Sequence, residues 1–392
     1  MRYVFFKHQL NWPRQAGHDI RSAEMMRAIA AKGHDVVFLS RVAPDALAID
    51  GLGLAAVEAV VPDARDREFK PPALQGRFFR YWGVAPAYAN AIARACARYD
   101  ADVLVSMGLD ALPYLVGPHR AVRVWYAADE WVLHHLSQVR MRDRTTWRNL
   151  EQAFVKGIYQ RAFAGSVDRM WVVTERDAWA GRWIAGFPNV DVIANGVDTH
   201  YYGARPVLEQ ANSAVFWGRL DFGPNVQALQ WFLGQVWPAV RARCPTATLR
   251  IIGFKPSPEV RHLSLAEGIT LQGDLADLRD EVCRHMVAIA PMVSGLGIKN
   301  KLLEAAAMAR PIVCTSRATL GMRLPAVPPM VIADRAANWV SALLSLWSDD
   351  AKRRSLGGEA RSWVETHHSW STAADLAMRP FESPARAQPA ER

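Results

Sequence analysis

The sequence alternates short apolar runs with helical patterns. The first half opens with the run RYVFF at 2–6, continues with an amphipathic stretch at 19–32, and reaches a second run, DVVFLS, at 35–40. Gly33 ends the predicted helix, because glycine commonly follows the last helical residue. Two strands joined through a helix are predicted to pair in parallel. This rhythm predicts a doubly wound α/β domain.

The same rhythm returns in the second half of the chain. Further strand candidates lie at 102–106, 122–127, 170–174 and 190–194, and then at 214–218, 248–253, 269–273, 286–291, 311–315 and 329–333. Residues 199–213 are rich in turn formers and show no clear helical period. We therefore predict domains at 1–198 and 214–378, joined by a linker at 199–213. The tail at 379–392 is rich in Pro, Ala and charge and is predicted to be disordered.

The composition agrees with two domains. A chain of 392 residues with 51% hydrophobic residues is too long for one compact core. Its four cysteines are widely scattered and form no spacing typical of a metal site or a disulfide framework, which predicts no metal and a cytoplasmic setting. The first apolar run is too short for a signal peptide, and no stretch is long enough for a membrane helix. Any membrane contact would be peripheral, at the inner face.

The net charge of +9 fits an anionic partner. Nucleic acid, a membrane surface and a phosphorylated substrate all satisfy this condition, and the charge alone does not choose among them. Residues 140–161 form a basic predicted helix with the aromatic residues Trp147, Phe154 and Tyr159. Such a helix fits a polyprenyl phosphate or an anionic membrane surface. The alternative is a solvated helix packed by its aromatic side chains.

The most informative stretch is PMVSGLGIKNKLLEAAAMARPIVCT, at 291–315. It reads as a strand, a loop with Gly295 and Gly297, a helix and another strand. The start of a helix presents free N–H groups and a partial positive charge, and glycine lets an anion approach the backbone closely. Lys299 and Lys301 would add full positive charges. The pattern favours a phosphate-binding loop.

Glu304 lies one turn into this predicted helix. A carboxylate aimed at a diphosphate would repel it, but the same group can accept hydrogen bonds from ribose hydroxyls. A structural alternative explains the stretch as a tight strand-to-helix turn, with solvated lysines and an acid favourably placed near a helix start. The residues by themselves leave both interpretations open.

The segment SGLGIKNKLLEAAAMARPIVCT resembles the donor-site motif of GT-B glycosyltransferases of the large retaining family four. That motif has two glutamates separated by seven residues, and Glu304 matches the second, which implies binding of the nucleotide ribose. Leu296 stands in place of the first glutamate, which contacts the donor sugar in the family. The chain thus resembles a variant with a glycine-rich loop and a Lys three residues before the Glu. The identity of the sugar stays open.

The start of the second half extends the resemblance. The stretch AVFWGRLDFGPNVQALQWFLGQVWPAV, at 214–240, is similar to the family's strand, Gly-Arg, loop and helix. This similarity implies that Arg219 contacts the donor diphosphate. The family often has a Lys a few residues later, where this sequence has Gly-Pro-Asn at 223–225. We hypothesise that Lys299 or Lys301 supplies the missing charge.

In the first half the resemblance lies in the order of the segments more than in their residues. The stretch NWPRQAGHDIRSAEMM, at 11–26, occupies the place of the family's first glycine loop. This placement implies that Gly17 and His18 face the donor phosphates and the acceptor.

The stretch WYAADEWVLHH, at 125–135, is similar to a family segment that often carries a His-Asp pair near the transferred sugar. Here Ala128 stands where the His would be, and Asp129 follows it. Asp129 is our candidate for binding or deprotonating the acceptor hydroxyl. Helix capping by the acids of this stretch is an equal alternative.

Taken as a whole, the resemblance implies a GT-B fold, in which two Rossmann-like, doubly wound parallel-sheet domains face a cleft. The implied activity is transfer of a sugar, with retention, from a nucleotide-sugar donor to a glycan or lipid-linked acceptor in bacterial polysaccharide or glycoconjugate synthesis. Neither a metal nor another cofactor is implied, and nucleic acid is not expected as a partner.

Two alternatives remain. The first is a GT-B-fold nucleotide-sugar epimerase. The second is a non-catalytic nucleotide-binding protein, which the net charge and the missing His favour. An NAD-linked oxidoreductase is not expected, because no GxGxxG follows the first strand.

Overall fold

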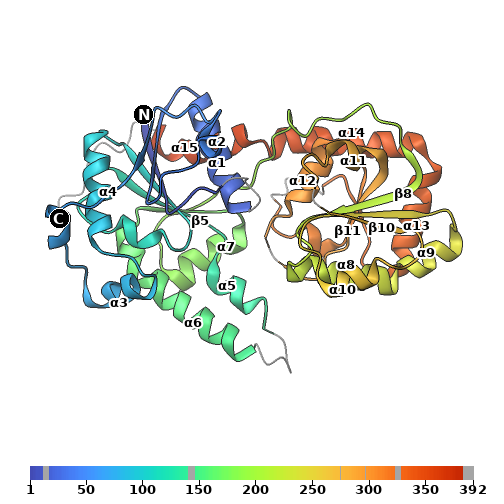
Figure 1. The fold of residues 1–392 in the computed structure, drawn as a ribbon, viewed down its shortest axis with the longest axis horizontal. Coiled ribbons are helices and arrows are strands. Elements are labelled where there is room, and N and C mark those ends of the chain that lie inside the picture. The colour runs from blue at the N-terminus through green and yellow to red at the C-terminus, as the bar shows by residue number, and fades with distance from the viewer. Residues whose placement is uncertain (12–16, 140–145, 274, 296, 323–327, 383–392) are drawn as a thin grey trace. The chain divides into compact units, whose positions relative to one another are not determined.

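The computed structural model describes residues 1–11, 17–139, 146–273, 275–295, 297–322 and 328–382. These residues form two compact units (Figure 1). The first unit consists of Met1–Ala194 together with residues 373–382, and the second of Asn195–Thr372. Among the described helices, none is both long and apolar enough to cross a membrane.

The first unit is built on a seven-stranded parallel sheet. Its strands are β1 (Arg2–Lys7), β2 (Asp35–Ser40), β3 (Ala56–Ala59), β4 (Val103–Met107), β5 (Val122–Ala128), β6 (Arg169–Val172) and β7 (Val190–Val192). They lie in the order β3-β2-β1-β4-β5-β6-β7, so the direction of winding reverses between β1 and β4. In open α/β sheets, ligands bind at the carboxyl ends of the strands beside such a switch point.

Helices enclose both faces of this sheet. They are α1 (Gly17–Ala31), α2 (Ala46–Ile49), α3 (Ala73–Tyr81), α4 (Ala87–Arg98), α5 (Trp131–Leu136), α6 (Thr146–Phe163) and α7 (Glu175–Ala180), with short helical turns at Arg65–Glu68, Leu112–Leu115, Ala164–Ser166 and Gly181–Ala185. Successive side chains of a strand point to opposite faces. Tyr3, Val4, Phe5 and Phe6 are all fully buried, which shows that both faces of β1 are covered. This burial explains why the strand reads as a continuous apolar run.

The second unit repeats the plan with six parallel strands. These are β8 (Gln210–Trp217), β9 (Thr248–Ile252), β10 (Ile269–Gln272), β11 (His285–Ala290), β12 (Ile312–Cys314) and β13 (Val331–Ile332). Their order is β10-β9-β8-β11-β12-β13, which places the switch point between β8 and β11. The helices are α8 (Gly223–Gln235), α9 (Trp237–Arg243), α10 (Pro258–Leu263), α11 (Arg279–Arg284), α12 (Asn300–Ala307), α13 (Ala336–Ser348) and α14 (Asp350–His367). The predicted pair of doubly wound parallel-sheet domains is confirmed.

The last described helix, α15 (Trp370–Glu382), changes the predicted domain bounds. It starts in the second unit, but from residue 373 onward it belongs to the first. Lys32 forms an ion pair with Asp375 at 2.6 Å, and the rings of Tyr3 and Phe381 lie 6.2 Å apart. The predicted second domain, at 214–378, includes most of this helix, because a helical pattern does not reveal which sheet the helix packs against.

Other boundaries differ as well. The second unit begins at Asn195, and β8 begins inside the predicted linker at 199–213. Residues 379–382, predicted to be disordered, are helical, and the rest of that predicted tail lies outside the described residues.

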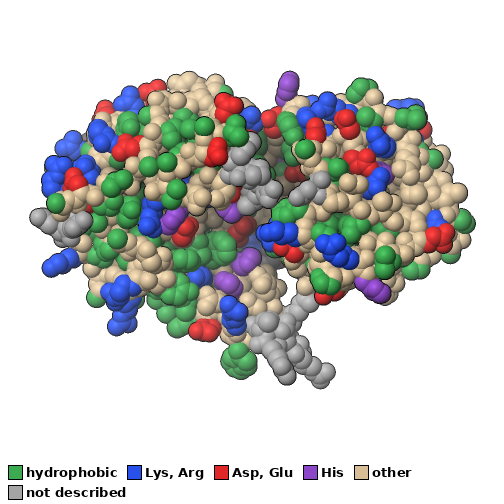
Figure 2. Space-filling view, viewed as in Figure 1, with side chains coloured by type: hydrophobic (Ala, Val, Ile, Leu, Met, Phe, Trp, Pro, Cys, Tyr) green, Lys and Arg blue, Asp and Glu red, His purple; other side chains and the backbone are tan. Residues whose placement is uncertain are grey.

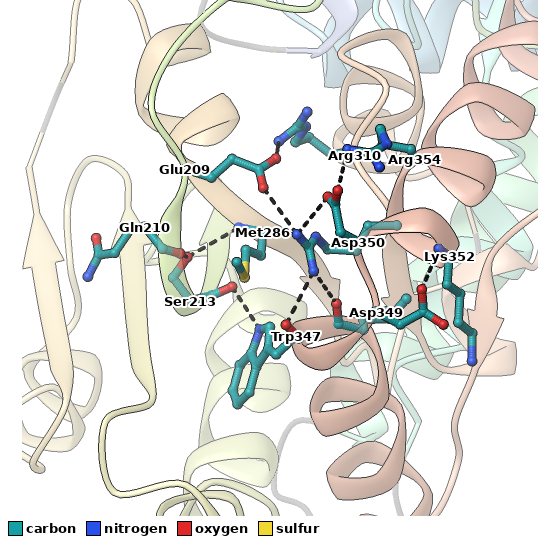
Figure 3. A network of polar contacts seen from close by, with 12 residues as sticks. Glu209, Gln210, Ser213, Met286, Arg310, Trp347, Asp349, Asp350, Lys352 and Arg354 are labelled. Atoms are coloured by element: carbon teal, nitrogen blue, oxygen red, sulfur yellow. Dashed lines mark hydrogen bonds and ion pairs between the residues drawn. The ribbon is translucent and has the colours of Figure 1, made fainter.

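A network of polar contacts that includes Glu209, Arg310 and Asp350 surrounds a buried arginine at helices α13 and α14 (Figure 3). The Nη1 group of Arg353 donates to the carbonyl oxygen of Leu346 at 2.8 Å, and Nη2 pairs with Asp350 at 2.9 Å. Glu209, next to the start of β8, accepts a hydrogen bond from Arg310 at 2.6 Å and lies 3.6 Å from Arg353. The guanidinium group therefore links the first strand of the second unit to two of its helices.

We expect Arg353→Ala to lower the free energy of unfolding by about 3 kcal/mol, because it leaves buried partners without their donor. Urea unfolding followed by tryptophan fluorescence measures the change. Arg354→Ala is the matched control, since its side chain is 74% exposed and also pairs with Asp350. An exposed pair contributes at most about 1 kcal/mol. Equal losses in the two variants would contradict a structural role for the buried network.

Candidate functional site

The carboxyl end of β8 brings Trp217 and Gly218 to the switch point of the second sheet. Gly218 has a φ of 141°, a backbone conformation that residues other than glycine rarely adopt. A Cβ atom here would lie 3.0 Å from Asn225 Nδ2 and 3.4 Å from Lys301 Nζ. The position therefore favours glycine, because a side chain would lie against Asn225 and Lys301.

Glu304, on α12, is held by the end of β8. Trp217 donates a hydrogen bond from its indole Nε1 to Glu304 Oε2 at 2.6 Å. Burial raises the pKa of the Glu304 carboxyl, while the Trp217 hydrogen bond and the charge of Lys301 act in the opposite direction. The indole is rigid, so one carboxylate oxygen is fixed in position. The other oxygen is the one that we expect a ligand hydroxyl to reach.

Lys301 lies in the first turn of α12, and its ammonium group is withdrawn from solvent. Its Nζ donates to Asn225 Oδ1 at 2.9 Å and lies 3.8 Å from the centre of the Phe216 ring. Burial lowers the pKa of Lys301 to about 7, against the opposing effect of Glu304. Asn225 in turn donates to the carbonyl oxygen of Arg219 at 2.8 Å. The structure thus brings the Lys301 charge to the Gly-Pro-Asn turn, where the resemblance leads one to expect a Lys.

The glycine-bearing loop leads directly into α12. Gly295 has a φ of 87°, and a Cβ atom there would lie 3.2 Å from Lys299 Nζ. Lys299 is the N-cap residue of α12, and its side chain does not cap the helix but donates from Nζ to the carbonyl oxygen of Gly297 at 2.6 Å. Lys299 is therefore folded over the loop at the positive end of the helix. Leu296 is outside the described residues.

Arg219 is less closely tied to this cluster than the sequence suggested. Its Nε and Nη2 donate to the two carboxylate oxygens of Asp221, at 2.8 and 3.1 Å. The side chain is 50% exposed. The backbone carbonyl of Arg219 accepts a hydrogen bond from Asn225, which also binds Lys301. The guanidinium group of Arg219 instead pairs with Asp221.

In the first unit, Gly17 and His18 open helix α1, and residues 12–16 before them are outside the described chain. The imidazole of His18 lies 3.6 Å from Asp19 and is largely exposed. Partial desolvation by the surrounding protein and then the charge of Lys7 lower the pKa of His18, although much of its side chain stays exposed. Asp19 is almost completely buried and pairs with Lys7 at 3.1 Å. Lys7 ends β1 at the switch point of this sheet. The residues predicted from the sequence, Gly17 and His18, are therefore chain neighbours of a buried ion pair that was not itself predicted.

Asp129 follows β5 on a tight turn. Ala128 has a φ of 66°, unusual for a residue other than glycine, and the N–H of Asp129 donates to the carbonyl of Ala127 at 3.0 Å. Strained backbone of this kind is often found at functional sites. The cap of α5 is Glu130, whose carboxylate accepts from the N–H groups of Val132 and Leu133 at 3.1 and 2.7 Å. The capping alternative therefore applies to Glu130.

Asp177, at the start of α7, joins these acids. Its pKa is raised to about 6, first by burial and then by the charges of Asp129 and Glu130, while a hydrogen bond from Thr174 opposes the shift. That hydroxyl donates at 2.6 Å. Asp177 is not among the site residues predicted from the sequence. The available signal was a Thr followed three residues later by an acid, directly after a strand.

A comparison with family models gives a match within the second unit. The family described as glycosyl transferases group 1 matches residues 211–349. This range contains Trp217, Arg219, Lys301 and Glu304, and the match supports the family resemblance over this part of the chain. A search of curated proteins finds no match.

Solved structures match over nearly the whole chain. Sucrose-phosphate synthase from Thermosynechococcus elongatus has a TM-score of 0.68 at 14% identity, covering 97% of this chain and 98% of that one. Anabaena Alr3699/HepE in complex with UDP-glucose has a TM-score of 0.64 at 13% identity, covering 98% and 100%. WaaG, a glycosyltransferase involved in lipopolysaccharide biosynthesis, has a TM-score of 0.58 at 14% identity, covering 97% and 100%. Together with the two parallel sheets, these matches show a GT-B fold.

Proposed function

We propose that this chain is a glycosyltransferase that moves a sugar from a nucleotide-sugar donor to an acceptor hydroxyl. The observation that carries the proposal is the cluster at the second switch point, where Trp217 fixes the Glu304 carboxylate beside the Lys301 ammonium group. The family match over residues 211–349 supports this function, and one structure of the same fold holds UDP-glucose.

The cluster separates two chemical tasks. Glu304 binds ribose hydroxyls, because a carboxylate accepts hydrogen bonds from neutral hydroxyl groups and repels phosphates. Lys301, Lys299 and the start of α12 bind the diphosphate, with Gly295 and Gly297 allowing it to approach the backbone. The diphosphate gains negative charge as the sugar bond breaks, so cations held in place beforehand lower the barrier. These groups promote departure of the leaving group without a metal ion or another cofactor.

Arg219 joins the diphosphate when the donor binds. Its present partner is Asp221, in a pair whose side chains are 50% and 34% exposed. Exposed ion pairs of this kind contribute at most about 1 kcal/mol, so exchanging a carboxylate for a diphosphate costs little. Arg219 is then the third cationic side chain on the donor diphosphate, after Lys301 and Lys299.

The first unit supplies the acceptor side of the reaction. Gly17 and His18 lie at the start of α1, and Asp129 is placed on its strained turn to bind or deprotonate an acceptor hydroxyl. The acceptor is a glycan or a lipid-linked glycan in bacterial polysaccharide or glycoconjugate synthesis. A match to a glycosyltransferase of lipopolysaccharide biosynthesis supports this class. The family resemblance further implies that the anomeric configuration is retained.

The first experiment is a thermal-shift panel of nucleoside diphosphates and nucleotide sugars with the full chain. We expect one base to stabilise the protein selectively and Arg219→Ala to weaken that stabilisation. Asp221→Ala is the matched control, since it removes the partner of Arg219 but keeps the guanidinium group. The selected donor is then incubated with and without candidate acceptors, and the product anomer is assigned by NMR.

The outcomes separate the candidate functions. Nucleoside diphosphate released only when an acceptor is present supports transfer. Conversion of the donor sugar without an acceptor would favour the epimerase. A panel in which no nucleotide stabilises the chain would contradict the donor site, and an inverted anomer would contradict retention alone.

A further inference from the structure

Helix α6 presents a row of exposed apolar side chains. Trp147, Leu150, Phe154 and Ile158 recur every three or four residues, so they share one face of the helix. Their exposed fractions are 81%, 37%, 70% and 36%. We call these four residues the α6 stripe. The opposite face of the helix packs in the core of the unit through Tyr159 and Phe163. The stripe is therefore not needed to hold α6 on the fold.

Helices α3 and α5 lie on either side of α6 (Figure 1). Gln75 of α3 donates to the carbonyl oxygen of Ala162 at 2.8 Å, and Gln160 of α6 donates to the α5 cap Glu130 at 2.8 Å. Both flanking helices add exposed apolar side chains. Leu74 and Tyr81 of α3 are 46% and 52% exposed, and Leu136 of α5 is 41% exposed. Exposed apolar side chains therefore occur on both helices that pack beside α6.

The charge of this surface is mostly of one sign. The exposed arginines are Arg77 and Arg80 of α3 and Arg148 and Arg161 of α6. Glu151 is the single carboxylate within the described bounds of α3, α5 and α6. Figure 2 shows hydrophobic and basic side chains intermixed on this part of the first unit. Helices α3 and α6 thus carry exposed indole and phenyl rings together with four exposed guanidinium groups.

We propose that the α6 stripe docks this protein on the anionic face of a lipid bilayer. A helix with Trp, Phe and Leu on one face and arginines at its borders lies in the interface, with the rings among the acyl chains and the guanidinium groups at the phosphates. A two-fold contact between copies of the chain would bring the same arginines together, which disfavours a dimer through this surface. A convex helix also offers no groove for a peptide.

The docking inference is independent of the donor chemistry. It concerns the exposed side chains of α6 in the first unit, and it holds whichever nucleotide the second unit binds. A test of lipid binding therefore leaves the proposed transfer reaction untouched, and each can fail without the other.

The test is co-sedimentation of the full chain with vesicles of phosphatidylcholine alone and of phosphatidylcholine with phosphatidylglycerol. We expect binding only to the anionic vesicles, weakened by added salt. The double variant Trp147→Ser with Phe154→Ser should reduce the partition coefficient by at least about tenfold, because it removes the two largest inserted rings. Leu265→Ser is the control, since that side chain is 80% exposed in the second unit. Melting temperatures confirm that the variants are folded.

Four results would overturn the proposal. The wild type could fail to bind anionic vesicles, or it could bind both vesicle types equally. The double variant could bind as strongly as the wild type, or the Leu265→Ser control could lose as much vesicle binding as the double variant. Analytical ultracentrifugation without lipid tests the rival occupant. If wild type is a dimer and the double variant a monomer, the stripe joins two copies of this chain instead.

Discussion

Glu304→Ala is expected to abolish the stabilisation of this protein by its nucleotide sugar and to lower kcat/KM by about a hundredfold or more. Trp217 holds one oxygen of the carboxylate, and we expect the other to accept from the ribose. A hydrogen bond to a charged group contributes about 1.5–3 kcal/mol. Two such bonds to a ribose correspond to roughly two to four powers of ten. Thermal shift and steady-state kinetics measure the two effects.

Two further variants separate binding from structure. Trp217→Phe keeps the carboxylate but removes the N–H that orients it. Its kcat/KM and its stabilisation by the nucleotide should therefore lie between those of wild type and of Glu304→Ala. Glu304→Gln keeps the size of the side chain and tests whether the negative charge is needed. The melting temperature of each unliganded variant shows whether the fold is kept. Undiminished nucleotide selectivity in Glu304→Ala would rule out Glu304 as the ribose contact.

The fold could be predicted because its pattern is local. Each strand of a parallel sheet buried on both faces reads as an apolar run, and each helix between strands shows its own period. The exception is β3, with the sequence AVEA, whose side chains are only partly buried at the sheet edge. Helix α15 shows the other limit, since its pattern predicts a helix but its packing partner, such as Tyr3, is far away in the chain.

The candidate site was predicted only where its residues are neighbours in sequence. Gly295, Lys301 and Glu304 lie on one loop and helix, and their order carries the phosphate-binding pattern. Trp217 and Asn225 join them through contacts that span 87 and 76 positions of the chain. Nothing in the local sequence relates a Trp at a strand end to a distant Glu. The parallel sheet relates them, because β8 and its neighbour β11 end at the same edge, and the loop that follows β11 leads into α12.

The two sheets use their switch points differently. In the second unit, the residues there are a fixed carboxylate, a desolvated amine and glycines with φ values of 141° and 87°. In the first unit, Lys7 and Asp19 already neutralise each other in a buried pair. An anionic diphosphate therefore has more to gain at the second switch point. The first is better suited to neutral hydroxyl groups, as an acceptor sugar presents.

We expect Lys301 to make the affinity for a nucleotide donor depend on pH. Its unliganded pKa is about 7, because its ammonium group is shielded from water. A bound diphosphate favours the charged form, so binding above pH 7 must take up a proton. The affinity of a nucleoside diphosphate should therefore fall by up to about tenfold for each pH unit above 7. Below pH 7 Lys301 is already charged, and this contribution to the pH dependence disappears.

Calorimetric titration with the nucleoside diphosphate at pH 7, 8 and 9 measures this slope. The window lies above the ionisation of the terminal phosphate, near pH 6, so the charge of the ligand stays constant. Lys301→Met should bind more weakly at pH 7 and lose the slope, because no group is left to take up the proton. Lys299→Met is the matched control, since it removes a positive charge from the same loop but leaves the Lys301 ammonium group on Asn225. If Lys301→Met keeps the slope of wild type, another group takes up the proton and Lys301 is not the cation that meets the diphosphate.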